Sequence, residues 1–120
     1  MASPEEIAWA AGLFEGEGCI SHIERGAGFD VQVALVMTDE DVVRRFYDVV
    51  DRGRVYGPYH PPSHRERKPF WRWVALGDAG HGVLDLLGPW LHSRRTRQAR
   101  EKGIDFPCKR WKPLPEPNSV

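Results

Sequence analysis

The segment that most limits the possible folds of this chain is AAGLFEGEG, residues 10–18. Two alanines and a glycine stand next to one another in a predicted helix, where small side chains let a neighbouring backbone approach closely. The same segment ends with Glu15 and Glu17 set between glycines. A solvent-facing helix has no need of the small residues, and a buried helix has no use for carboxylates at its tip. We therefore predict a closely packed helix that delivers acidic groups to one chosen point.

The start of this helix is marked by Ser3, a favourable N-cap, and by Pro4, which suits the first helical position. Glu6 completes a capping box with Ser3 and interacts favourably with the helix dipole. Apolar residues then recur at helical spacing, namely Ile7, Ala10, Ala11 and Phe14. Gly16 and Gly18 are expected to end the helix.

Four further stretches have the composition and alternation of β-strands. They are CISHIE at 19–24, FDVQVALVM at 29–37, GRVYGPY at 53–59 and PFWRWVAL at 69–76. RGAG predicts a turn between the first two strands. In the second strand, apolar side chains alternate with a mixed and partly polar set, which indicates one core-facing side and one open side.

Three more helices are expected. Thr38 is predicted to cap the second helix, in TDEDVVRRFYDVV, whose buried stripe is Val42, Val43, Phe46, Val49 and Val50. Asp78 is predicted to cap a helix through Leu87, and Pro89 to start another that runs past Ala99 to Gly103. The order α-β-β-α-β-β-α-α predicts an α+β fold with one antiparallel sheet and its helices on one face.

The chain has 120 residues, which suits one domain. We expect that domain at residues 1–104, followed by a basic, proline-rich tail at 105–120. Lys and Arg together number 17, as do Asp and Glu, but residues 1–51 hold 11 acidic against 3 basic residues, and residues 52–120 hold 14 basic against 6 acidic. This asymmetry permits a basic, phosphate-binding face on a neutral protein. Solvated charges that happen to be unevenly spread would give the same numbers.

The two cysteines, Cys19 and Cys108, do not make a disulfide framework and favour a reducing compartment. No apolar stretch is long enough for a membrane span, and the N-terminus lacks the pattern of a secretion signal. We therefore expect a cytoplasmic protein with no membrane partner.

AAGLFEGEG resembles the nonapeptide motif of the LAGLIDADG homing endonucleases. Both acidic positions are kept, as Glu15 and Glu17, and Ala10 and Phe14 are apolar replacements. The residues identical to the motif are Ala11, Gly12, Leu13 and Gly18. TDEDVV opens a second helix where the family expects one, and RKPFWRW and LGPWLHSRR look like the second hairpin and closing helix of bacterial and phage members. The resemblance spans roughly residues 5–103.

The resemblance implies a saddle-shaped, four-stranded antiparallel sheet in αββαββα(α) order that binds double-stranded DNA. The implied activity is a site-specific DNA endonuclease, which hydrolyses phosphodiester bonds with Mg2+, or with Mn2+ or Ca2+ in the same site. Only one motif is present, so the family's packing across a two-fold axis implies a homodimer on a long pseudo-palindromic site. Ala11, Gly12 and Glu15 are then expected near the dimer contact. No small-molecule substrate is expected.

The family context also implies where such a protein works. The expected setting is the cytoplasm of a bacterium or a phage-infected cell, with the protein at the nucleoid when it is bound to DNA. The reading frame could belong to an intron, an intein or a free-standing mobile element.

By the same resemblance, Glu17 is the metal ligand, with the backbone carbonyl of Gly16 beside it. Carboxylate-bound divalent cations suit phosphodiester hydrolysis because they activate water and neutralise phosphate charge. Many members carry Asp in place of Glu17, so the longer side chain would hold a metal at a different distance. A solvated carboxylate at the helix end is the alternative, although an acid there opposes the helix dipole.

A basic residue near the start of the last helix usually completes the site in this family. That position matches Arg94, with Arg95 as the neighbouring substitute, where many members have Lys. Arg binds phosphate but cannot act as a base, so its expected role is electrostatic. Thr38 and Asp39 resemble the position of a water-ordering polar residue, and both also suit helix capping.

DNA contacts are expected on the helix-free face of the sheet, because antiparallel strands fit the major groove. The predicted strand contacts are Ser21, Ile23, Arg25, Gln32, Ala34, Val36, Arg54, Tyr56 and Arg72. The loop cations Arg65, Arg67 and Lys68 are better interpreted as phosphate contacts, and Arg95 is included among the DNA contacts. Trp71 and Trp73, on either side of Arg72, are predicted to lie in the core.

Two other functions stay open. Some relatives in the LAGLIDADG family keep the fold but lose cleavage, and act as DNA-binding regulators or in intron splicing. A zinc module would instead use Cys19-x2-His22 with His60-x3-His64. Against it, a predicted strand and helix separate the two pairs, and alternation places Cys19 on the strand face opposite His22.

Overall fold

The computed structural model of the chain describes residues 2–61 and 68–102. The elements follow the order α1 (Pro4–Glu17), β1 (Gly18–Arg25), β2 (Gly28–Met37), α2 (Glu40–Val50), β3 (Arg54–Tyr59), β4 (Phe70–Leu76), α3 (Asp78–Leu87), the 3-10 helix η1 (Gly88–Trp90) and α4 (Ser93–Glu101). This order confirms the α+β arrangement that the sequence predicts. None of the described helices is long and apolar enough to span a bilayer.

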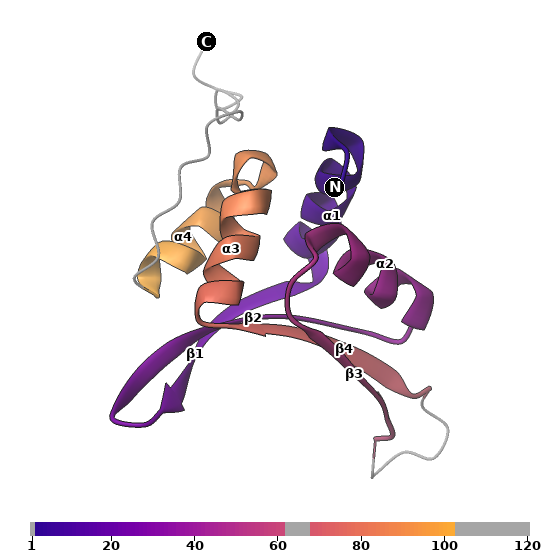
Figure 1. The fold of residues 1–120 in the computed structure, drawn as a ribbon, viewed down its shortest axis with the longest axis horizontal. Helices are drawn as coiled ribbons and strands as arrows, with labels where there is room; N and C mark the ends of the chain where they lie inside the picture. Colours follow the sequence, from indigo (N-terminus) through magenta and orange to yellow (C-terminus); the bar gives the residue numbers. More distant parts are fainter. Residues whose placement is uncertain (1, 62–67, 103–120) are drawn as a thin grey trace, which may run out of the picture.

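The four strands form one antiparallel sheet in the order β1-β2-β4-β3. Gly26 and Ala27 make the two-residue turn of the first hairpin, and Gly26 has a φ of +60°, which suits glycine. Figure 1 shows all four α-helices on one side of the sheet, whose two ends bend away from the helices. The opposite side of the sheet carries no helix.

The register separates the side chains into a core set and an open-face set. Ile20, Val33, Leu35, Trp73 and Ala75 face the helices and are buried. The alternate positions, from Ser21 and Gln32 on β1 and β2 to Arg72 and Tyr56 on β4 and β3, face the other way. The period-2 pattern of the sequence therefore predicts both faces correctly.

Aromatic side chains form the centre of the core. Trp73 and Phe46 are fully buried and meet edge-to-face, with ring centroids 4.8 Å apart. Phe14 also stacks with Phe46, with ring centroids 6.4 Å apart. The Trp73 indole Nε1 donates to the Arg52 carbonyl at 2.8 Å, so its polar atom is satisfied. The predicted core position of Trp73 is confirmed, and Trp71 is partly buried against the same core.

The N-terminus of α1 has the predicted capping box. The Ser3 hydroxyl accepts from the Glu6 amide at 3.2 Å, and the Glu6 carboxylate accepts from the Ser3 amide at 3.1 Å. Hydrogen bonding to the Glu6 carboxylate, first from the Ser3 backbone amide and second from the Ser3 side chain, lowers the pKa of the Glu6 carboxyl, because it favours the charged form.

The other predicted helix starts are corrected. Helix α2 begins at Glu40, with Asp39 rather than Thr38 at the N-cap position, and Asp39 makes no side-chain capping bond within the described chain. Helix α3 begins at Asp78, and its N-cap position is Gly77. The long helix predicted from Pro89 is wrong as well. The chain forms only a 3-10 turn there, becomes extended at the buried Leu91, and starts α4 at Ser93.

Candidate active site and sheet surface

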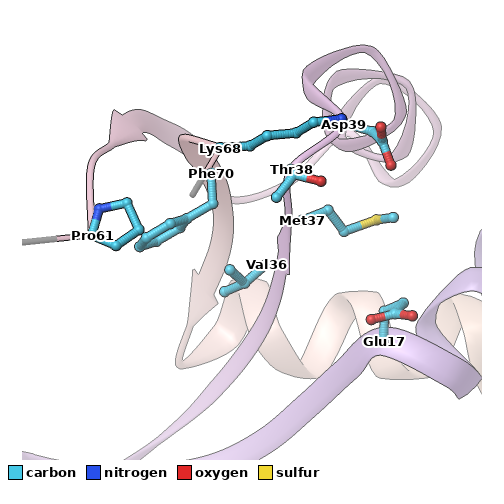
Figure 2. A pocket seen from close by; sticks show the side chains of 8 residues that line it. All are labelled: Glu17, Val36, Met37, Thr38, Asp39, Pro61, Lys68 and Phe70. Atoms are coloured by element: carbon cyan, nitrogen blue, oxygen red, sulfur yellow. The ribbon is translucent and has the colours of Figure 1, made fainter. Parts of the chain in front are cut away.

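The described structure has a pocket of about 690 Å³ at the junction between α1, the end of β2 and the start of β4. Its lining residues are Glu17, Val36, Met37, Thr38, Asp39, Pro61, Lys68 and Phe70. Figure 2 shows the Glu17 carboxylate on one side, with Thr38 and Asp39 above it and Lys68 extending in the direction of Asp39. Three of the predicted site residues, Glu17, Thr38 and Asp39, are therefore brought together.

Glu17 reaches this pocket because α1 passes directly into β1. Gly18 pairs with Leu35 in the register, so the preceding residue lies beside the end of β2. A Cβ on Gly18 would lie 2.3 Å from the Phe14 ring, so only glycine lets the chain turn from helix to strand over this buried aromatic. The position of the Glu17 carboxylate in the pocket therefore depends on the glycine that follows it.

The other acidic residue of the motif, Glu15, binds the opposite part of the chain. Its Oε1 accepts from the His92 amide and contacts the His92 Nδ1, both at 2.7 Å. Its backbone carbonyl accepts from Arg94 Nη2 at 2.7 Å and from Arg95 Nε and Nη2 at 3.2 and 3.1 Å. Glu15 therefore ties the end of α1 to the start of α4.

The arginines at this junction differ in their surroundings. Arg95 is only 7% exposed, lies over the Phe14 ring and also donates to Gln98, so it offers little surface to a partner, and its contact with DNA stays a prediction. Burial lowers the pKa of its guanidinium, and the nearby Arg94 charge lowers it further, while Glu15 acts in the opposite direction. Arg94 is exposed, but it does not line the pocket with Glu17.

Lys68 is the cation among the eight residues that line the pocket. The sequence places it in a basic loop as one of three phosphate contacts, and no local pattern separates it from the other two. Lys68 lies just before β4, and the pairing of β4 with β2 brings the start of β4 beside Thr38 and Asp39. Arg65 and Arg67, the other predicted loop contacts, lie outside the described residues.

All of the predicted strand contacts lie on the open face of the sheet. Three cross-strand sets are Ser21–Gln32–Leu76, Cys19–Ala34–Val74–Arg54 and Val36–Arg72–Tyr56. Arg25 also lies there and pairs with Asp30 at 3.1 Å. Ala34 is only 6% exposed, so it offers little surface to a partner. The contact of this face with DNA stays a prediction.

Two glycines, Gly12 and Gly16, lie at exposed positions of α1. A Cβ added to Gly12 or Gly16 would have nothing within 4 Å in the described chain. Ala11, by contrast, is 1% exposed and packs in the core, and its place in a dimer contact stays a prediction. The small residues of the motif thus serve two sides of one helix, with Ala11 inside and Gly12 outside.

Within the described residues, no three His, Cys, Asp or Glu side chains gather where they could hold a metal ion. The zinc alternative meets a further difficulty, since Cys19 and His22 project from opposite faces of β1. His22 instead contacts the Lys102 carbonyl through Nε2 at 2.7 Å. His64, the last member of that set, lies outside the described residues.

No family model matches the sequence, and a search of curated proteins gives no significant match. Solved structures are similar to this one. The homing endonuclease I-CvuI, in complex with its target in the presence of Ca, gives a TM-score of 0.60 at 18% identity over 82% of this chain and 62% of that chain. The group I intron-encoded homing endonuclease I-CeuI, complexed with DNA, gives 0.57 at 12% identity over 83% and 53%.

The archaeal intron-encoded homing endonuclease I-Vdi141I, complexed with DNA, gives a TM-score of 0.51 at 12% identity over 88% of this chain and 60% of that chain. This chain thus spans less than two thirds of the length of each of these proteins. The structural similarity agrees with the motif at residues 10–18. The chain has the fold of the homing endonucleases, as its LAGLIDADG-like motif predicts.

Proposed function

We propose that this chain is a metal-dependent endonuclease that binds double-stranded DNA on the open face of its sheet and cleaves it at the Glu17 pocket. The observation that carries the proposal is the position of Glu17. Its carboxylate stands where α1 meets the sheet, in one pocket with Lys68, Thr38 and Asp39. The pocket thus combines acidic, basic and hydroxyl groups beside a surface suited to a duplex.

The open face supports the binding part of this proposal. Arg54 and Arg72 can contact phosphates or guanine, and Gln32 can contact adenine in the major groove. The similar structures of I-CvuI, I-CeuI and I-Vdi141I are complexes with DNA, which favours the same kind of ligand here. A neutral chain can bind DNA this way because these cations lie together on one side.

The donor set in the pocket suits Mg2+. Mg2+ binds one or two carboxylates and completes its octahedron with water and substrate phosphate oxygens. Glu17 and Asp39 provide hard oxygen donors, and the Gly16 carbonyl is a further candidate beside Glu17. When bound, the ion would supply Lewis-acid stabilisation and a more acidic water. Among the similar structures, the I-CvuI complexes were obtained with Ca or Mg.

The residues of this chain would divide the rest of the work. Lys68 would neutralise charge on the scissile phosphate as water attacks phosphorus and the ester oxygen leaves. Thr38 can donate to and accept from the attacking water, and Asp39 can accept its proton. Glu15, Arg94 and Arg95 would keep the end of α1, and so Glu17, at a fixed place relative to the sheet.

The exposed glycine face of α1 supports a homodimer. Gly12 and Gly16 present bare backbone without a neighbour in the described chain, so an identical helix could approach closely there. A two-fold dimer would place two Glu17 pockets beneath one duplex and would favour a pseudo-palindromic site.

The test is selection of cleaved sites from a randomised duplex library with Mg2+, followed by cleavage and binding assays on the selected site. We expect Glu17→Gln to slow cleavage at least about a hundredfold while keeping DNA affinity, because it removes the charged donor but not its shape. Asp48→Asn, which removes a carboxylate from an exposed position of α2, is the matched control and should cleave normally. Specific binding without cutting in Mg2+ or Mn2+ would instead identify a DNA-binding protein of the same fold.

A further inference from the structure

The end of the open face beside the Glu17 pocket is apolar, and we define it here as the apolar corner. Its members are Val36, Tyr56, Tyr59, Pro61 and Phe70. Val36, Tyr56 and Tyr59 are 44%, 45% and 41% exposed, so their surfaces are open to a ligand rather than used in packing. The rings of Tyr59 and Phe70 lie 5.3 Å apart and support each other.

The apolar corner is continuous with the pocket. Val36, Pro61 and Phe70 line the pocket together with Glu17. Figure 2 shows Val36 between Phe70 and Glu17. A base pair that contacts this corner would therefore lie next to the phosphate bound at the Glu17 pocket.

The composition of the corner contrasts with the other end of the same face. Ser21 pairs with Gln32, and Arg25 forms an ion pair with Asp30, so that end carries polar groups. Arg72 is the cation that the register places beside the corner, between Val36 and Tyr56, and Lys68 lines the adjoining pocket. A ligand of the corner must match apolar surface at most of its points and one guanidinium.

On the proposed function, we infer that the apolar corner reads thymine through its 5-methyl group, which makes T beside the scissile phosphate part of the recognition site. In the major groove, the thymine methyl is the apolar group that a base pair presents. Aromatic stacking on bases needs unpaired nucleotides and does not apply to an intact duplex. Arg72 adds a donor for a guanine next to these thymines.

The expected size of the effect follows from burial of one methyl group. Removing it from water contributes about a fourfold gain in affinity, so replacing thymine by uracil should cost about fourfold at each corner position. Uracil pairs with adenine as thymine does and lacks only the methyl group. If two copies bind as a dimer, the loss of affinity with uracil should occur at symmetric positions in the two half-sites.

The experiment measures dissociation constants for the selected duplex, with each thymine replaced in turn by deoxyuridine. The variant is Val36→Thr, which keeps the shape and the β-branch of the side chain but exchanges a methyl for a hydroxyl. The matched control is Ile23→Thr, on the same face but at the remote end of β1. Thermal unfolding of each variant confirms that the fold is kept.

In the wild type, we expect a fourfold loss at thymines within a few base pairs of the cleaved bonds. In Val36→Thr, the ratio of the dissociation constants of the uracil and thymine duplexes should fall towards one at one or more of these positions. In Ile23→Thr, the fourfold ratio at the same positions should remain. Equal weakening of thymine and uracil duplexes by Val36→Thr would overturn the inference, because the corner would then bind something other than the methyl. Absence of any uracil effect near the cut would overturn it too.

These outcomes are separate from failure of the proposed function. If the chain binds no duplex from the library, the proposed function itself fails. If it binds and cleaves a site whose central thymines tolerate uracil, the endonuclease proposal stands and the thymine inference alone is wrong.

Discussion

The buried guanidinium of Arg95 donates two hydrogen bonds to the backbone carbonyl of Glu15, from Nε at 3.2 Å and from Nη2 at 3.1 Å. The last carbonyls of a helix have no partner within the helix. None of the residues in the last turn of α1 is basic, so cations from α4 meet its negative dipole end instead. This contact holds the helix end that carries Glu17.

Arg95→Met should therefore destabilise the protein by about 2–3 kcal/mol, since it removes two charge-assisted hydrogen bonds to the Glu15 carbonyl while roughly keeping the side-chain length. Arg95→Lys should lose less, because it retains a cation. Urea unfolding measures both. Arg97→Met, an exposed change on the same helix, should be nearly neutral, and equal stability of the Arg95 and Arg97 variants would contradict this account.

The two glycines that flank Glu17 should respond oppositely to alanine. A Cβ at position 18 meets the Phe14 ring at 2.3 Å, so Gly18→Ala should cost about 1–3 kcal/mol from overpacking. A Cβ at position 16 has nothing within 4 Å, so Gly16→Ala should be neutral or stabilising by up to about 1 kcal/mol. Thermal unfolding of the isolated chain compares them, and a large loss in Gly16→Ala would refute the prediction.

A substitution at Gly12 tests the proposed homodimer. Gly12→Arg should leave the single chain folded, because the position is exposed in the described structure, but should prevent close approach of a second α1. Sedimentation velocity should then show monomer where the wild type shows dimer, and DNA cleavage should fall with it. Asp48→Arg on α2 controls for the added charge. A wild type that is monomeric both free and on DNA would rule out this contact.

Lys68 should matter for the rate of cleavage more than for binding. Lys68→Met removes the cation that lines the pocket and should slow cleavage about a hundredfold at saturating protein. Lys68→Arg should recover part of the rate because it restores the charge. Arg54→Met removes a cation from the same face outside the pocket and should weaken binding without slowing cleavage. Equal effects of Lys68→Met and Arg54→Met on binding and cleavage would indicate that Lys68 only contacts the DNA backbone.

Local features of this chain were predictable because their causes are local. The capping box of Ser3 depends on residues three positions apart, and the open-face set depends on alternation within single strands. The family resemblance added the predicted metal-binding role of Glu17, which no propensity rule supplies. The pocket residues Thr38 and Asp39 were found through the same resemblance.

Features set by distant contacts could not be read in this way. Glu15 binds His92 and Arg95, which are 77 and 80 positions away in the chain. Arg94 and Arg95 are adjacent and chemically identical, yet one is exposed and the other buried, because α4 starts only after Leu91 has entered the core. Lys68 was placed beside the pocket by strand pairing, which the loop sequence does not encode.

The cross-strand alignment of Ser21, Gln32 and Leu76 has a practical consequence for re-engineering specificity. The three side chains come from three strands and point away from the core, so their codons can be randomised together while every core residue is retained. On the proposed function, a library built on this trio would sample new base preferences as a unit while the core of the parent scaffold is unchanged.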